Sequence, residues 1–198
     1  MKEFDQLDEK LVDWIGRQRM YFVGTAPSGD DGLVNISPKG WMDSFRVLGP
    51  RQVAYLDVFG SGVETIAHLK QNGRIVVMLC AFEGGPRILR LHGHGDVLEH
   101  GTPAFDRLIG AFPVGATQGG ERSIRSIIRV DVERIADSCG YGVPRMDYVG
   151  ERDQYERGTA VKERKQGAEE LLEFRRKRAA VSLDGLPALT QPDVSSRA

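Results

Sequence analysis

A series of short β-rich segments separated by turn residues constrains the fold of this chain more than any other feature. MYFVGTA, LVNIS, FRVLG and QVAYLD follow one another between residues 20 and 57, with Gly, Asp or Pro in the connections. RIVVMLCAF, RILRLHGHGDVLEH and SIRSIIRVDVERI continue the series to residue 135. Because most connections are short turns, we expect antiparallel strands in a small barrel or closed sheet, and not a doubly wound parallel fold.

Helical patterns precede and interrupt this β-rich region. Residues 3–18 carry apolar side chains three and four positions apart, which predicts a helix that covers the core. Ser61 and Glu64 match a Ser-x-x-Glu capping box, which predicts a helix that closes at Asn72 and Gly73. One helix is therefore expected before the strands and one after QVAYLD. Thr102 and Pro103 predict a further helix before the last strand.

The C-terminal part of the chain has a different composition. From about residue 151 to 178 it reads as a charge-rich helix, and the chain of 198 residues needs no second domain. We expect a β-rich domain with its N-terminal helix over residues 1–150 and a helical extension of the same domain over residues 151–190. Residues 191–198 are expected to form a flexible tail.

The charge balance argues against two classes of partner. Lys and Arg number 27 against 28 Asp and Glu, so the chain has no overall basic character for nucleic acid or an anionic membrane. The stretch KERKQGAEELLEFRRKR intersperses acids with bases, as solvated helices do. The N-terminus lacks a secretion signal and no segment reaches about 18 apolar residues, so we expect a soluble, cytoplasmic protein.

Cysteine and histidine usage indicates neither a disulfide framework nor a metal site. Cys80 and Cys139 lie far apart and form no CxxC motif, so both are expected to be buried, reduced thiols. His92 and His94 have the spacing that places both rings on one side of a strand. No nearby Glu or Cys completes a ligand set, so no metal is predicted.

Two stretches have the residue types of an anion site. Ser37, Lys39 and Arg46 lie close in sequence around Gly40. A glycine lets the backbone approach a ligand closely, and lysine and arginine supply charge-assisted hydrogen-bond donors. The helix start at Ser61 and Gly62 offers backbone N–H groups and the positive end of a helix dipole. Simpler interpretations remain open, because polar turns and capping boxes occur in proteins of every function.

Two further residues in these stretches qualify this interpretation. In the capping box, Glu64 places a carboxylate where a phosphate would otherwise sit. Trp41, in the middle of the first stretch, is expected to pack in the core or an interface rather than to shield a ligand.

Several segments in one order resemble the pyridoxamine 5'-phosphate oxidase-like, FMN-binding split-barrel family, in particular its small members. They are NISPKG with FRVLG, VAYLD with GSGVETIAHLKQNGRIVVMLCAFEG, RILRLHGHG, and DSCGYGVP with DGLPAL. The resemblance covers residues 18 to 190. It implies a mainly β, α+β fold: a six-stranded antiparallel split β-barrel with peripheral helices and a C-terminal charged helix. It also implies a homodimer with a flavin in each cleft at the interface.

The resemblance assigns cofactor-binding roles residue by residue. Matched to the family, Ser37, Pro38 and Lys39 would line the flavin ring and ribityl chain. Ser61, Gly62 and Thr65 would face the phosphate. Two arginines complete the predicted set: Arg125, which could reach across from the other subunit, and Arg46, added for its charge and its closeness in sequence.

Two departures from the true oxidases limit what the resemblance implies. At the helix start those enzymes carry an adjacent Arg-Lys pair for the phosphate, and this chain has Glu64 and Thr65. Their C-terminal Arg-x-His segment, which grips pyridoxal phosphate, is replaced by the charged helix near residue 160. Oxidation of vitamin B6 is therefore not expected.

The function that follows is an FMN-dependent oxidoreductase. It would move a hydride or electrons between a reduced nicotinamide or similar donor and a small organic acceptor. The flavin carries the redox chemistry, so no catalytic residue is assigned. Two alternatives stay open: a deazaflavin-dependent reductase on the same fold, and a non-catalytic protein that binds flavin or haem.

Overall fold

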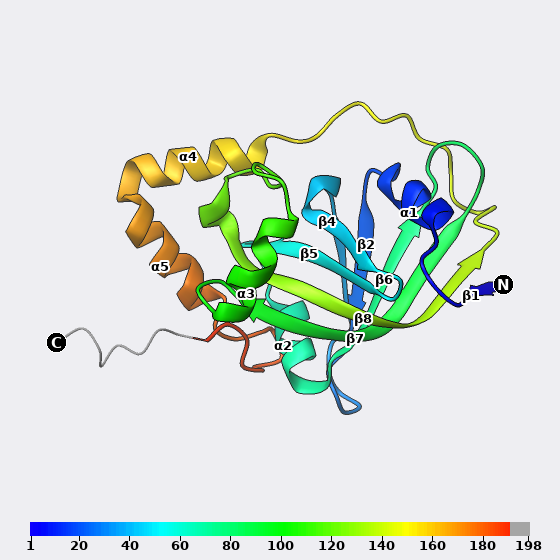
Figure 1. Cartoon of the computed structure of the whole chain (residues 1–198). Helices are drawn as coiled ribbons and strands as arrows, with labels where there is room; N and C mark the ends of the chain where they lie inside the picture. Colours follow the sequence, from blue (N-terminus) through cyan, green and yellow to red (C-terminus); the bar gives the residue numbers. More distant parts are fainter. Residues whose placement is uncertain (191–198) are drawn as a thin grey trace.

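A computed structural model gives the course of residues 1–190 (Figure 1). The tail predicted over residues 191–198 lies outside this described part. The strands are β1 (Lys2–Phe4), β2 (Tyr21–Thr25), β3 (Asn35–Lys39), β4 (Phe45–Gly49), β5 (Gln52–Val58), β6 (Arg74–Cys80), β7 (Ile88–Glu99) and β8 (Ile124–Ser138). The helices are α1 (Glu9–Gly16), α2 (Glu64–Asn72), α3 (Pro103–Leu108), α4 (Gln154–Gln166) and α5 (Ala168–Arg178).

All strands belong to one antiparallel sheet. Its order is β3-β2-β6-β7-β8-β5-β4, and β1 pairs with the C-terminal end of β8. The predicted mainly β, α+β split barrel is confirmed, with eight strands in place of six and a sheet that does not close within the described residues. Strands β3 and β4 are its two edges.

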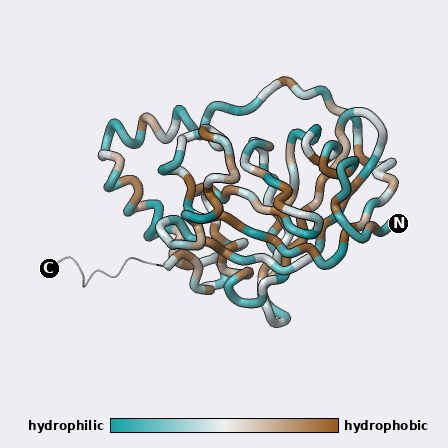
Figure 2. The backbone as a smooth tube through the Cα atoms, in the orientation of Figure 1, coloured by the Kyte–Doolittle hydropathy of each residue, from teal (hydrophilic) through white to brown (hydrophobic). Residues whose placement is uncertain are grey.

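The sheet curls so that strands far apart in its order meet in the core. Tyr21 of β2 packs against Phe45 of β4 and Tyr55 of β5, with ring centroids 4.9 Å and 5.6 Å away. The apolar residues of this core are buried, and Figure 2 shows hydrophobic positions concentrated along the strands. The register between β7 and β8 shifts at His92 and Gly93, where Glu133 of β8 has no opposite residue, as in a β-bulge on β8. The strands approach so closely here that a Cβ on Gly93 would overlap the carbonyl of Asp131.

The N-terminal segment differs from the predicted single helix over residues 3–18. Residues 2–4 form β1, which pairs with residues 135–137 of β8. The helix α1 begins only after Asp8, whose carboxylate accepts a hydrogen bond from the Leu11 N–H at 2.8 Å. The apolar period was correct for α1, but pairing with β8 takes the first residues into the sheet.

The C-terminal segment forms two helices where one was predicted. Gly167, with φ of 87°, separates α4 from α5. Before them, residues 139–153 cross the molecule as a long connection (Figure 1). After them, the chain returns to the barrel, where Ala188 and Leu189 are buried in the main core.

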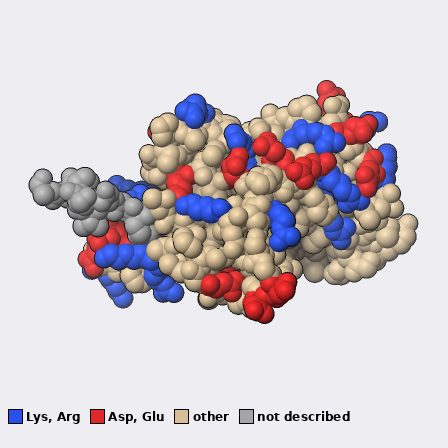
Figure 3. Space-filling view, turned by 90° about the horizontal axis from the view of Figure 1, so that it is seen from below, with Lys and Arg blue, Asp and Glu red and all other residues tan. Residues whose placement is uncertain are grey.

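Surface features complete the comparison with the sequence. Cys80 is buried as predicted, but Cys139 is exposed, because it follows the end of β8 where the chain leaves the sheet. Acidic and basic side chains are interspersed on the face that Figure 3 shows. Within residues 1–190, no helix combines the length and the apolar character that crossing a bilayer requires.

Candidate functional site

A cavity of about 480 Å³ lies between β3, the start of α2 and the N-terminal end of β8. It is lined by every residue predicted to bind the cofactor except Arg46: Ser37, Pro38, Lys39, Ser61, Gly62, Thr65 and Arg125. These residues come from three segments that are far apart in the sequence. The fold therefore brings the two stretches with anion-binding character together.

The alternation of β3 explains which of its side chains face the cavity. Asn35, Ser37 and Lys39 line it, while the intervening Ile36 is 70% exposed on the outer side of this edge strand. One strand thus supplies the cavity with an amide, a hydroxyl and an ammonium group.

Asp57, at the end of β5, organises the two cations of the cavity. Its carboxylate is fully buried and accepts hydrogen bonds from Lys39 Nζ at 3.1 Å and Arg125 Nε at 2.7 Å. Burial alone would raise the pKa of Asp57, but the guanidinium of Arg125 and the ammonium of Lys39 outweigh it and hold the pKa below its usual value. Asp57 is therefore ionised, and Arg125 is anchored within its own chain.

Asp57 is not among the residues predicted from the sequence, although a signal was present. In VAYLD an acidic residue ends an otherwise apolar strand. A charge in such a strand is buried and must have a basic partner, which for Asp57 comes from other strands.

Asn35 connects the hydroxyl groups of the cavity. Its amide donates to Thr65 Oγ1 at 3.0 Å and Thr25 Oγ1 at 3.1 Å, and its carbonyl oxygen accepts from Ser37 Oγ at 3.0 Å. Thr25 Oγ1 lies 3.0 Å from Nδ1 of the buried His68. Because Thr65 Oγ1 accepts from Asn35, its own O–H is left to donate to a bound group.

The start of α2 differs from the predicted capping box. The N-cap residue is Val63, and no side chain caps the helix. Ser61 instead lines the cavity, which leaves the first N–H groups of the helix without a side-chain cap. The Glu64 carboxylate lies over Gly62, where a Cβ would collide with it, and accepts from the Leu183 N–H at 3.4 Å.

Arg46 does not line this cavity. Its guanidinium donates to the carbonyl oxygens of Phe45 at 2.7 Å and Ala111 at 3.3 Å, and lies 6.0 Å from the Phe112 ring. Closeness in sequence was misleading here, because the turn after β3 and the direction of β4 take Arg46 toward the segment that follows α3.

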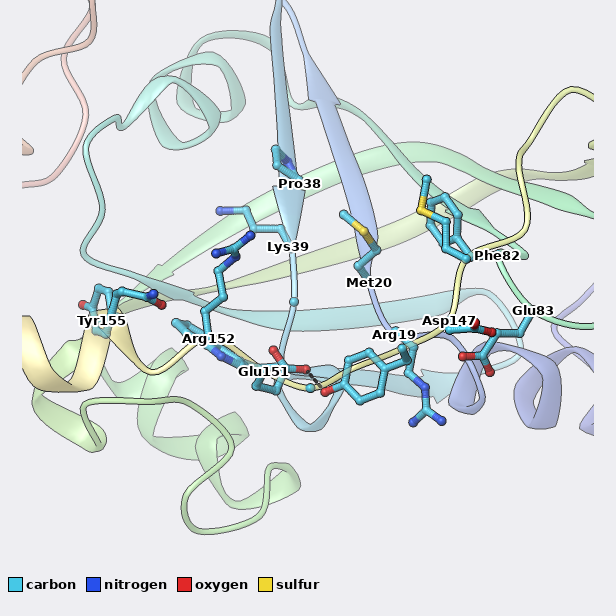
Figure 4. A pocket seen from close by; sticks show the side chains of 16 residues that line it. Arg19, Met20, Pro38, Lys39, Phe82, Glu83, Asp147, Glu151, Arg152 and Tyr155 are labelled. Atoms are coloured by element: carbon cyan, nitrogen blue, oxygen red, sulfur yellow. Dashed lines mark hydrogen bonds between the residues drawn. The ribbon is translucent and has the colours of Figure 1, made fainter.

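A second cavity of about 810 Å³ adjoins the first (Figure 4). Residues 38–41 line both cavities, and residues 146–155 cover the second. No motif in the sequence indicated this covering segment, because its position against the barrel depends on the course of the long connection.

Trp41 stands between the two cavities in an unusual conformation. Its backbone is left-handed, with φ of 53° and ψ of 69°. Such a conformation costs about 1–3 kcal/mol in a non-glycine residue and is typical of functional sites. The ring is only half-buried, outside the main core, and packs edge-on against Tyr155 at 5.6 Å. Tyr155 is itself fixed by a hydrogen bond to the Phe59 carbonyl at 2.8 Å.

Comparison with known proteins assigns the family. No protein-family model matches the chain. The pyridoxamine 5'-phosphate oxidase family protein ustO of Aspergillus flavus is 37% identical over 196 residues, which span 94% of this chain and 77% of that protein.

Two solved structures show more distant likeness. HupZ of Group A Streptococcus is 20% identical, with a TM-score of 0.48, over 71% of this chain and 98% of HupZ. An FMN-binding protein of Syntrophomonas wolfei is 15% identical, with a TM-score of 0.43, over 64% and 80% of the two chains. The assignment rests on the Aspergillus relative, whose identity extends over nearly the whole chain. This chain belongs to the pyridoxamine 5'-phosphate oxidase family.

Proposed function

We propose that this protein is a homodimeric FMN-dependent oxidoreductase that binds its flavin in the cavity between β3 and α2. One observation carries the proposal: this cavity unites residues from β3, the start of α2 and β8 that family resemblance assigns to the cofactor. Its volume of about 480 Å³ lies in the range of cofactor and ligand sites.

The donors at the start of α2 fit a phosphate group. Ser61 and Thr65 supply hydroxyl groups, Gly62 lets the backbone approach closely, and the helix supplies uncapped N–H groups. The Glu64 carboxylate opposes an anion at the same place. The phosphate would therefore be held mainly by neutral donors, in place of the missing Arg-Lys pair.

The cations of the cavity fit the remainder of the cofactor. Lys39 and Arg125 share the charge of Asp57, so the three together present one net positive charge. Ser37, Pro38 and Lys39 would line the flavin ring and ribityl chain. Bound FMN would supply the redox chemistry between a reduced nicotinamide or similar donor and a small organic acceptor. The protein contributes binding, orientation and a fixed positive charge beside the cofactor.

The edge strand β3 supports a dimer with the cofactor at its interface. Its outward face and the residues before it expose apolar side chains, with Leu33 57%, Val34 71% and Ile36 70% exposed. An exposed apolar edge strand is an unusual liability for a free surface. A second copy on this edge would cover these side chains and complete the cavity.

The absorption spectrum of the purified protein tests the cofactor. A flavin spectrum, release of FMN by mass spectrometry and bleaching by NADH or NADPH are the expected results. Release of a deazaflavin would identify the alternative reductase. Bound flavin or haem without reduction or turnover would identify a binding protein, and a colourless protein that takes up no added FMN would refute the proposal.

Removing two phosphate donors tests the orientation of the cofactor. Ser61→Ala combined with Thr65→Ala should weaken FMN binding by about tenfold or more, because each hydroxyl donates to a charged group. Riboflavin, which lacks the phosphate, should bind both proteins about equally. Equal losses for the two ligands in a fluorescence titration would place the phosphate elsewhere.

A further inference from the structure

The larger of the two cavities has walls and charges that specify a class of ligand (Figure 4). We propose that it binds the substrate, a flat apolar molecule that carries one carboxylate, and that Arg152 binds this carboxylate. The assignment as substrate rests on the proposed function, because it requires a cofactor in the neighbouring cavity. The binding site itself can be tested without the cofactor.

The walls of the cavity are mainly apolar and aromatic. Met20, Trp41, Phe82, Met146 and Tyr155 line it. Aromatic and thioether side chains contact flat rings favourably, and the volume of about 810 Å³ accommodates a ligand of several rings. The strained backbone of Trp41 holds its ring in this wall.

Arg152 is a cation of this cavity with no partner among residues 1–190. The other two are engaged: Lys39 binds Asp57 at 3.1 Å, and the Arg19 guanidinium lies 4.7 Å from the Tyr148 ring. In Figure 4 the Arg152 side chain extends from the covering segment in the direction of Lys39. A guanidinium matches the geometry of a carboxylate with two parallel hydrogen bonds.

The acidic residues of the cavity restrict the charge of the ligand. Glu83 and Asp147 lie at the opposite end from Arg152 (Figure 4), and neither has an ion-pair partner among residues 1–190. Glu151, between the two ends, accepts from the Tyr148 hydroxyl at 2.9 Å. This distribution directs an anionic group toward Arg152 and opposes a dianion, so it favours a carboxylate over a phosphate.

The shared wall places such a ligand next to the proposed cofactor. Residues 38–41 line both cavities, so a molecule in the larger one contacts the segment that would line the flavin. A ligand with its carboxylate on Arg152 is directed toward this shared wall, because Arg152 extends toward Lys39 in Figure 4.

Calorimetric titration of the full chain with three naphthalene probes tests the site. The probes are 2-naphthoate, its neutral amide and 2-naphthyl phosphate. The unmodified protein should bind the carboxylate at least about tenfold more tightly than the amide and more tightly than the phosphate. Arg152→Gln should remove this preference, and Arg152→Lys should restore part of it. Arg164→Gln, an exposed α4 residue that lines neither cavity, should match the unmodified protein.

Equal binding of naphthoate by the Arg152→Gln and unmodified proteins would overturn the assignment of Arg152. Tighter binding of the phosphate would overturn the carboxylate class. FMN binding, measured on the same preparations, separates the two proposals. If naphthoate binding depends on Arg152 but the protein binds no FMN, only the cofactor proposal is refuted. If the protein binds FMN but naphthoate binding does not depend on Arg152, only the proposal for this site is refuted.

Discussion

At the scale of single residues, Asp57 is the side chain that organises the two cations of the smaller cavity. We expect Asp57→Asn to lower the free energy of unfolding by about 3–5 kcal/mol, because Lys39 and Arg125 would lose their buried counter-ion. Chemical denaturation measures this loss.

The pair Asp96 and Arg129 provides a matched control, because both of its side chains are more than a third exposed. Asp96→Asn should cost about 1 kcal/mol or less. Similar losses in the two variants would show that Asp57 contributes no more than a surface ion pair.

His68 predicts a pH dependence of stability in the mildly acidic range. Burial lowers its pKa, so the unfolded chain takes up the proton at a higher pH than the folded protein does. The free energy of unfolding should therefore be largest above about pH 6.5 and should fall as the pH decreases below it. His92, whose pKa is also lowered by burial, contributes in the same direction.

Denaturation at several pH values measures this dependence. His68→Gln should have a shallower slope between about pH 6.5 and 5 than the unmodified protein. An unchanged slope would mean that burial does not hold His68 in its neutral form.

At the scale of elements, Gly73 shows how one residue closes α2 and sets up β6. It has φ of 71°, and its carbonyl accepts from the Gly95 N–H at 2.8 Å. Gly73→Ala should destabilise the protein by at least about 1–2 kcal/mol, because the backbone would be strained and the new Cβ would overlap the His94 ring. Gly110→Ala, at a site with open space and no positive φ, should change stability by less than about 0.5 kcal/mol. Equal effects in thermal unfolding would contradict this role.

Local patterns predicted the elements better than their ends. The β-rich composition and the turn residues between segments identified the strands from β2 to β8, because both signals are local in the sequence. It did not predict β1, which exists only because β8 has a free stretch to pair with. The Ser61 and Glu64 pattern located α2 but not its cap, because Ser61 lines the cavity instead.

The candidate site was predictable only as far as family resemblance and side-chain chemistry extend. Resemblance named the residues that gather around the smaller cavity. Asp57 was overlooked, because its partners lie on β3 and β8 and the sequence does not show strand order. The larger cavity depends on where residues 146–155 lie after a long connection, and no local pattern specifies that position.

At the scale of the whole molecule, dimerisation through the β3 edge is the main prediction. Ile36→Lys should convert the proposed dimer to a monomer, because it places a charge in the apolar contact between the two copies. FMN binding should weaken with it, because the monomer would lack the part of the cavity that the second copy supplies. Light scattering with size-exclusion chromatography measures the mass. Val114→Lys, at a fully exposed position away from β3, should remain dimeric. A dimer that persists in Ile36→Lys would exclude this edge.

A crystal structure of the protein grown with FMN would show directly where the flavin binds. We predict flavin density in the cavity between β3 and α2, with the phosphate beside Ser61, Gly62 and Thr65 and the ring against Ser37 and Lys39. An empty cavity in crystals grown at saturating FMN, or a flavin bound elsewhere on the chain, would contradict this prediction.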